Sequence, residues 1–209
     1  MRMRKKGYRE EVLKQRSDVL VTKPELLKGQ WKSSMNCEIL HLELGSGKGD
    51  FWSLMAKRYP LEGWIGVEKN LDVAAIALRK VNKPAAANCR FIALSAEYLD
   101  DWFVPGEIDV LHLNFSDPWP KNAHAKRRLT HPFYLAVYKR LLKAEGKILF
   151  KTDNKDLMDY SLVSLADNDF NLVFYDAAYK RVNEEIVSEY EARFEALGLP
   201  IFHAIWQVK

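Results

Sequence analysis

The stretch from Ile39 to Gly49 constrains the fold more than any other part of the sequence. It reads Ile-Leu-His-Leu-Glu-Leu-Gly-Ser-Gly-Lys-Gly, a short apolar run that ends in an acid and three alternating glycines. An unbroken aliphatic stretch of strand length, closed by glycines, predicts a buried parallel strand that leads through a tight turn into a helix. Glycines at such a turn let the backbone approach a ligand closely.

The spacing of this turn separates three kinds of ligand. A phosphate loop needs Ser or Thr after Gly-Lys, but here Gly49 follows Lys48. A dinucleotide loop needs a glycine where this chain has Asp50, whose carboxylate would repel a pyrophosphate at a helix N-terminus. S-adenosylmethionine carries a sulfonium and an ammonium and no phosphate, so it suits the acid Glu43 beside the loop better. A dinucleotide, and a turn that binds nothing, remain as alternatives.

Composition places the chain among ordinary folded proteins. Its 209 residues are 48% hydrophobic and 29% charged, which favours one folded domain over a disordered chain. Cys37 and Cys89 lack metal-ligand spacing and are too few for a disulfide framework, so we expect reduced thiols in a cytoplasmic protein without a metal site. No apolar run reaches the roughly 20 residues that span a bilayer, and no signal peptide is present, so we expect no membrane partner.

The N-terminal region differs in charge from the rest. We divide the chain into a basic arm and connection over residues 1–30 and a single domain over residues 31–209. Such an arm is typical of a phosphate-binding tail, and a solvated, frayed terminus is the alternative. Its first part holds the basic residues Arg2, Arg4, Lys5, Lys6, Arg9, Lys14 and Arg16.

The hydrophobic pattern alternates between strands and helices along the chain. This alternation predicts an α/β fold with a Rossmann-like, mostly parallel sheet and helices on both faces. The short gap before the last strand predicts that this strand is antiparallel and forms a hairpin-like edge. Further strands are expected at Gly63 to Glu68, Arg90 to Ser95, Ile108 to Phe115, Lys147 to Lys151, Asn171 to Tyr175 and Ile201 to Val208. Helices are expected at Asp50 to Tyr59, Leu71 to Val81, Phe133 to Leu142 and Glu184 to Leu197.

Polar residues follow the ends of the first three expected strands. Glu68 stands 25 residues after Glu43, close to the offset at which an acid meets ribose hydroxyls in nucleoside-binding folds. Ser95 ends the third strand. The carboxyl ends of parallel strands meet at one edge, so we expect these side chains in one crevice. An unpaired surface glutamate is the alternative for Glu68.

The segment Ser116-Asp117-Pro118-Trp119-Pro120-Lys121 directly follows the fourth expected strand. It brings a carboxylate, an aromatic ring and a lysine to the same crevice. Prolines on both sides predict an extended backbone at Trp119. A basic cluster follows and is expected to meet the phosphates of a substrate, unless it is a solvated charge run. Its residues are His124, Lys126, Arg127 and Arg128.

At these motifs the chain resembles the bacterial tRNA (guanine-N7-)-methyltransferases. The resemblance runs from the Met-Arg-Met-Arg start to the last strand, and Ser-Asp-Pro-Trp-Pro-Lys is its most specific segment. It implies a class I methyltransferase fold with an antiparallel last strand. The matching segments are Glu-Leu-Gly-Ser-Gly-Lys-Gly at 43–49, Ser-Asp-Pro-Trp-Pro-Lys at 116–121, Lys-Arg-Arg-Leu at 126–129 and Lys-Thr-Asp-Asn at 151–154.

The resemblance also implies roles for individual residues. Glu43, Glu68 and Asp117 fall where the family binds S-adenosylmethionine, together with Gly45 and Gly47 of the loop, and Asp117 is also assigned to the active site. Residues 123–128 match the loop that contacts RNA. Positions that match the family's substrate contacts are Lys121, Asp153, Ser188, Glu189, Tyr190 and Glu191.

Two positions depart from the family pattern. Ser95 stands where the family usually has an acid near the adenine; a hydroxyl still forms hydrogen bonds but carries no charge, so the affinity for the donor is expected to fall. Ser188 replaces a threonine and keeps the hydroxyl.

The function implied is methyl transfer from S-adenosylmethionine to N7 of a guanine in the variable region of tRNA, by a monomer or homodimer. A non-catalytic RNA-binding subunit and a nicotinamide-dependent oxidoreductase are the alternatives.

Overall fold

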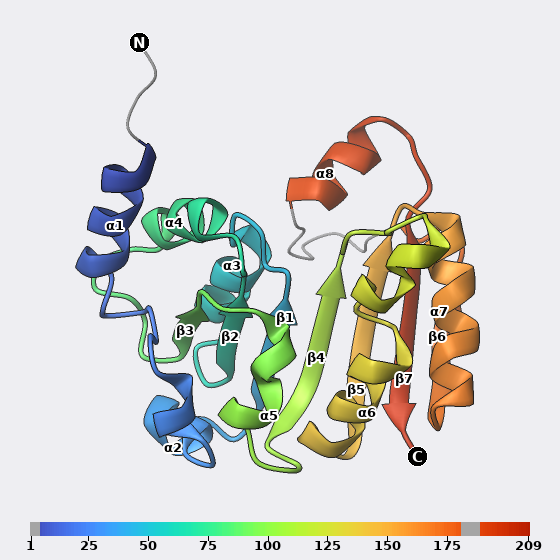
Figure 1. The fold of residues 1–209 in the computed structure, drawn as a ribbon, viewed down its shortest axis with the longest axis horizontal. Helices are drawn as coiled ribbons and strands as arrows, with labels where there is room; N and C mark the ends of the chain where they lie inside the picture. The colour runs from blue at the N-terminus through green and yellow to red at the C-terminus, as the bar shows by residue number, and fades with distance from the viewer. Residues whose placement is uncertain (1–4, 181–188) are drawn as a thin grey trace. The chain divides into compact units, whose positions relative to one another are not determined.

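The computed structural model describes residues 5–180 and 189–209, which form α-helices, short 3-10 helices (η) and β-strands (Figure 1). The chain divides into two compact units, Met1–Phe103 and Val104–Lys209. The predicted division at residue 31 stays a prediction.

The first unit is built on three parallel strands. β1 (Leu40–Leu44) pairs with β2 (Gly63–Val67), and β2 pairs with β3 (Cys89–Ile92), in the order β3-β2-β1. Every residue of β2 is buried, as expected for a strand covered on both faces. The crossovers contain α3 (Asp50–Arg58) and α4 (Leu71–Lys80), which confirms both predicted helices to within one residue at their ends.

Short helices complete this unit. They are α1 (Lys5–Gln15), η1 (Pro24–Leu27), α2 (Trp31–Met35), η2 (Ala96–Tyr98) and α5 (Leu99–Trp102). The indole of Trp31 is fully buried and donates a hydrogen bond of 2.8 Å to the carbonyl of Trp102. Burial and this bond attach α2 to α5.

Arg16 of the basic arm is buried. The guanidinium of Arg16 donates to the carbonyls of Leu78 and Val81 and pairs with Asp18 at 2.9 Å. The hydrogen bond from Arg16 lowers the pKa of the Asp18 carboxyl. Arg16 is only 6% exposed, so it joins α1 to α4 and is not available to phosphates. Arg2 and Arg4 lie outside the described residues.

The second unit contains four strands in the order β4-β5-β7-β6. β4 (Ile108–Asn114) and β5 (Leu142–Thr152) are parallel, and β7 (Phe202–Val208) is antiparallel to both β5 and β6 (Phe170–Asp176). Its helices are η3 (Asn122–Arg127), α6 (Pro132–Leu141), α7 (Lys155–Asp167) and α8 (Glu189–Ala196).

The last strand is antiparallel as predicted, but its predicted edge position is wrong. β7 lies between β5 and β6 and pairs with both. Ala204 and Trp206 are almost completely buried there, whereas Leu172 and Phe174 of β6 are about half exposed. The more buried strand takes the inner place because both of its faces are covered.

Helix α7 was not predicted. Its buried residues include Ser161 and Ser164 beside Leu157 and Leu165, so small polar side chains dilute its apolar face. Asn154 caps the helix by accepting a hydrogen bond from the Leu157 N–H at 2.8 Å.

Both cysteines are free thiols in the structure, as predicted. Burial raises the pKa of the Cys89 thiol to about 12, which keeps it protonated and unreactive. In residues 5–180 and 189–209, no helix is long and apolar enough to cross a bilayer, and no cluster of three or more potential ligands could hold a metal ion.

His131 caps helix α6 and is sensitive to pH. Its Nδ1 accepts a hydrogen bond of 3.2 Å from the Phe133 N–H. Burial lowers the pKa of His131 from its usual 6.5, and the charges of Lys126 and Arg128 lower it further. The unfolded chain therefore takes up this proton first, so stability falls as the pH drops from about 6.5 through the lower folded pKa.

We expect His131→Asn to reduce this pH dependence, because asparagine caps a helix without titrating. Urea unfolding of both proteins at pH of about 7.5 and about 5 measures this pH dependence of stability, since the unperturbed imidazole titrates within that range. The unsubstituted protein should lose more stability on acidification than the variant. Equal losses would contradict the role of His131.

Candidate active site

The predicted site residues divide over the two units. The glycine turn, Glu43, Glu68 and Ser95 belong to the first, and Asp117 with the predicted substrate contacts belongs to the second.

The glycine turn leaves β1 through backbone torsions that suit glycine. Gly45, Gly47 and Gly49 have φ angles of 73°, 54° and 74°, in the left-handed region. The N–H groups of Gly45 and Ser46 both donate to the carbonyl of Val67, at 2.9 and 3.0 Å. The turn is therefore attached to the end of β2.

Ser46 strengthens this attachment. Its hydroxyl donates to the Glu43 carbonyl and accepts from the Val67 N–H, both at 3.1 Å. Gly66 makes room for it, since a Cβ at that position would lie 3.0 Å from the Ser46 hydroxyl. Ser46 was not predicted as a site residue, because its partner Val67 belongs to the neighbouring strand β2.

The turn presents open space where a ligand would meet the backbone. A Cβ at Gly45 would have no heavy atom within 4 Å, and one at Gly47 would meet only a carbonyl oxygen at 3.9 Å. Glu68 lies beside this space: its Oε2 accepts from the Gly47 N–H at 3.2 Å and its Oε1 from the Asn70 N–H at 2.7 Å. The carboxylate keeps further lone pairs for the hydroxyl groups of a ligand. Glu43 is 3% exposed at the end of β1.

The third glycine has a different purpose. A Cβ at Gly49 would lie 2.8 Å from the Cβ of Ala77, so this glycine allows α3 and α4 to pack closely. Asp50, whose carboxylate was expected to repel a pyrophosphate, forms an ion pair with Lys80 at 2.6 Å. Its charge is therefore partly balanced, and the charge argument against a dinucleotide is weaker than the sequence suggested.

Ser95 caps the short helix η2. Its hydroxyl accepts from the Glu97 N–H at 3.4 Å, and the side chain is half-buried. Glu97 is exposed and lies two residues after Ser95, the position at which the family usually has an acid.

The loop of residues 116–121 follows β4 in the second unit. Asp117 is exposed and Trp119 is half-buried. The predicted extended backbone at Trp119 is wrong, because its φ is 42°, and Phe115 at the start of the loop has a φ of 51°. Bulky residues rarely adopt such torsions, so the surrounding contacts hold the loop in a strained conformation.

The basic cluster lies beside this loop on and after η3. Lys121 precedes η3, and Lys126 is exposed. The guanidinium of Arg127 lies 4.8 Å from the centre of the Trp119 ring, and the His124 ring meets the same indole edge-to-face at 5.7 Å. Arg128 turns the other way and bonds to the loop backbone. Three members of the cluster, His124, Arg127 and Arg128, thus contact Trp119.

The Lys-Thr-Asp-Asn segment at the end of β5 divides into structural and exposed residues. Thr152 is buried and accepts from the Asn154 N–H at 3.1 Å, and Asn154 caps α7. Lys151 forms an ion pair of 2.7 Å with Glu191. Asp153 is exposed and is the carboxylate of this segment that faces solvent.

Glu191 is 1% exposed and its carboxylate is held by Lys151, which also lies 4.4 Å from the centre of the Tyr179 ring. This pair fastens α8 to β5. Ser188 lies outside the described residues, and so do the side chains of Glu189 and Tyr190. The role of Lys151 was missed because its partner stands 40 residues away in the sequence.

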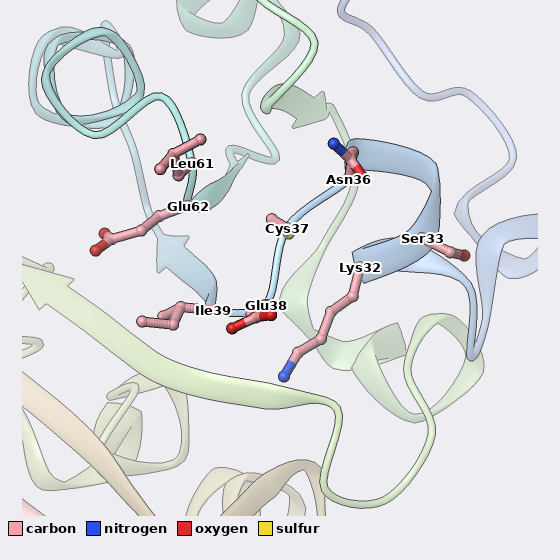
Figure 2. A pocket seen from close by; sticks show the side chains of 8 residues that line it. All are labelled: Lys32, Ser33, Asn36, Cys37, Glu38, Ile39, Leu61 and Glu62. Atoms are coloured by element: carbon pink, nitrogen blue, oxygen red, sulfur yellow. The ribbon is translucent and has the colours of Figure 1, made fainter.

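A cavity of about 630 Å³ lies elsewhere in the first unit, before the start of β1 and β2 (Figure 2). It contains no predicted site residue. Its lining comes from α2, the segment after it and the turn before β2: Lys32, Ser33, Asn36, Cys37, Glu38, Ile39, Leu61 and Glu62.

Comparison with solved structures identifies the fold. A mutant 16S rRNA (adenine(1408)-N(1))-methyltransferase from Catenulisporales acidiphilia, solved with its cosubstrate SAM, matches with a TM-score of 0.65 and 13% identity over 86% of this chain and 90% of that chain. An antibiotic-related methyltransferase matches with a TM-score of 0.66 and 18% identity over 90% of this chain and 95% of that chain. These matches confirm the predicted Rossmann-like class I methyltransferase fold.

Sequence comparison is more specific. Residues 37–204 match the family described as "Putative methyltransferase". A tRNA (guanine-N(7)-)-methyltransferase from Listeria monocytogenes is 42% identical over 97% of this chain and 96% of its own length. The protein of the same name from Bacillus subtilis is 40% identical over 98% of this chain and 97% of its own length. The chain belongs to the tRNA (guanine-N(7)-)-methyltransferase family.

Proposed function

We propose that this protein transfers the methyl group of S-adenosylmethionine to N7 of a guanine in the variable region of tRNA. The observation that carries this proposal is its 42% identity to a tRNA (guanine-N(7)-)-methyltransferase over 97% of the chain. The open glycine turn and the exposed Asp117 support it from the structure.

The residues of the first unit fit the methyl donor. The open side of Gly45 and Gly47 would admit an adenosyl group close to the backbone, and the Glu68 carboxylate would accept hydrogen bonds from ribose hydroxyls. The buried Glu43 adds a negative charge that suits the donor's cationic groups. S-adenosylmethionine, when bound, supplies an electrophilic methyl group on a sulfonium.

The residues of the second unit are assigned to the acceptor. Guanine N7 already has an in-plane lone pair, so Asp117 has no proton to remove before transfer. Its carboxylate instead stabilises the positive charge that develops on the methylated ring. Alignment of the acceptor with the methyl group supplies the rest of the rate enhancement.

Recognition of the guanine requires hydrogen-bond acceptors for its N1 and N2 hydrogens and a donor for O6. Asp153 is exposed and suits the first task, and Lys121 is exposed and suits the second. Glu191 is also among the expected substrate contacts, but its carboxylate already accepts from Lys151. Trp119, which contacts His124 and Arg127 and is half-buried, is a candidate for stacking on the base, and Tyr190 is the second aromatic candidate.

The tRNA backbone is assigned to the exposed basic residues beside the loop. Lys126 and Arg127 are exposed, and His124 is half-buried beside them. The charges of Lys126 and Arg127 would neutralise phosphates and release counterions. We place the enzyme in the cytoplasm, in agreement with its free thiols, as a monomer or homodimer.

The purified protein, methyl-labelled S-adenosylmethionine and unmodified tRNA test the function directly. After digestion of the RNA, the label should appear in 7-methylguanosine at a variable-region position. Donor binding without transfer would favour a non-catalytic RNA-binding subunit. Failure to bind the donor, combined with binding of a nicotinamide cofactor, would favour an oxidoreductase.

The two outer glycines of the turn give a matched test of the donor site. Gly45→Ala and Gly49→Ala place alanine at nearly the same φ, which costs each about 1–2 kcal/mol. The Cβ at Gly45 enters open space, so donor affinity should fall at least about tenfold with little further loss of stability. The Cβ at Gly49 meets Ala77, so Gly49→Ala should lose an additional ~1–3 kcal/mol of stability.

Calorimetry with S-adenosylmethionine and thermal unfolding separate these effects. Unchanged donor affinity in Gly45→Ala would remove the turn from the donor site.

We expect Asp117→Ala to lower the turnover number by at least about a hundredfold at saturating donor, because it removes the stabilising charge. Asp167→Ala is the control, since Asp167 is an exposed residue at the C-terminal end of α7. Initial rates of methyl transfer and circular dichroism spectra measure activity and fold. Full turnover in Asp117→Ala would overturn its catalytic role.

A further inference from the structure

Two adjacent arginines after the 116–121 loop have different surroundings. Arg128 is half-buried: its Nε donates to the carbonyl of Pro118 at 3.1 Å and its Nη2 to the carbonyl of Trp119 at 3.0 Å. Arg127 is exposed and places its guanidinium over the Trp119 ring. Arg128 therefore binds the loop backbone, whereas Arg127 contacts the face of the indole.

The two carbonyls that Arg128 binds flank the strained part of the loop. Trp119 has a φ of 42°, and its neighbours on both sides are prolines, which have no N–H to form a stabilising turn bond. Charge-assisted hydrogen bonds from a planar guanidinium are stronger than neutral ones and fix orientation as well as distance. Asp117 directly precedes Pro118, so the position of its backbone depends on these bonds.

Arg128 is itself held from the other side. Its guanidinium lies 4.4 Å from the centre of the Tyr160 ring of α7. Two residues further on, the hydroxyl of the buried Thr130 is 2.8 Å from the Ser161 hydroxyl, and its carbonyl accepts from Ser164 at 2.7 Å. Helix α7 thus anchors the segment that carries Arg128, and Arg128 transmits this anchoring to the loop.

We propose that Arg128 is a positioning residue that holds the 116–121 loop, and that Tyr160 supports it. Contact with tRNA phosphates then falls to the exposed neighbours Lys126 and Arg127. This inference rests on the proposed function for its kinetic part, but the order of the loop is measurable without turnover.

Arg128→Lys and Arg127→Lys form the main comparison, because both keep the positive charge. Lysine serves a phosphate as a point charge, but it cannot bond two carbonyls in the fixed geometry of a guanidinium. We expect Arg128→Lys to lower the turnover number about tenfold to a hundredfold, as a displaced catalytic loop does, with the KM for tRNA within about twofold. Any effect of Arg127→Lys should fall on the KM for tRNA and not on the turnover number, because Arg127 is assigned to phosphates and not to the loop backbone.

The alanine variants separate positioning from phosphate binding. Arg127→Ala should reduce the slope of log Kd for tRNA against log salt by about 1, whereas Arg128→Ala should leave the slope unchanged. Tyr160→Phe keeps the ring and should retain full turnover. Tyr160→Leu removes the ring and should reproduce part of the Arg128→Lys defect.

Hydrogen exchange of the peptide that contains residues 116–121 gives the measurement that is independent of turnover. Exchange should be faster in Arg128→Lys and Tyr160→Leu than in Arg127→Lys. If the unsubstituted protein fails to methylate tRNA, the proposed function fails while this difference still tests the loop. Equal exchange and full turnover in Arg128→Lys, or a reduced salt slope in Arg128→Ala, would overturn the proposal.

Discussion

The ends of the buried strands impose the constraint on which the site depends: each backbone group that emerges from a buried strand needs a hydrogen-bond partner. At the end of β1, the N–H groups of Gly45 and Ser46 meet this need at the Val67 carbonyl. At the end of β4, the Phe115 N–H donates to the Lys151 carbonyl at 2.8 Å. These backbone groups are thereby satisfied by main-chain carbonyls, which leaves Asp117 exposed. Glu68 accepts two backbone N–H groups and keeps further lone pairs for a ligand.

Patterns that are local in sequence were predicted well. The aliphatic run and glycines at Ile39 to Gly49 identified a strand, a turn and a helix, and each is present. The Asp-Pro-Trp-Pro motif identified the family. Prediction was poorer where burial decides. Helix α7, whose buried face includes Ser161 and Ser164, was not predicted, and the order of β6 and β7 depends on which strand is covered on both sides.

The roles of several site residues depend on partners that no local pattern contains. Arg128 and Tyr160 are 32 positions apart, and charge alone made Arg128 look equivalent to Arg127. Lys151 belongs to a family motif, yet its function as the partner of Glu191 depends on how α8 folds back. The sequence motifs therefore identified the correct region of the structure, but they did not distinguish exposed residues from the residues that hold them in place.

The buried pair of Lys151 and Glu191 also makes the docking of α8 depend on β5. A buried lysine and glutamate are costly to desolvate separately, so α8 gains a stable place only after β5 has formed and presents Lys151. Among the described side chains of α8, Phe194 is half-buried and its ring stacks on that of Phe115, with the ring centres 5.7 Å apart. The place of α8 in the second unit therefore depends on β5, through Lys151, and on the end of β4, through Phe115.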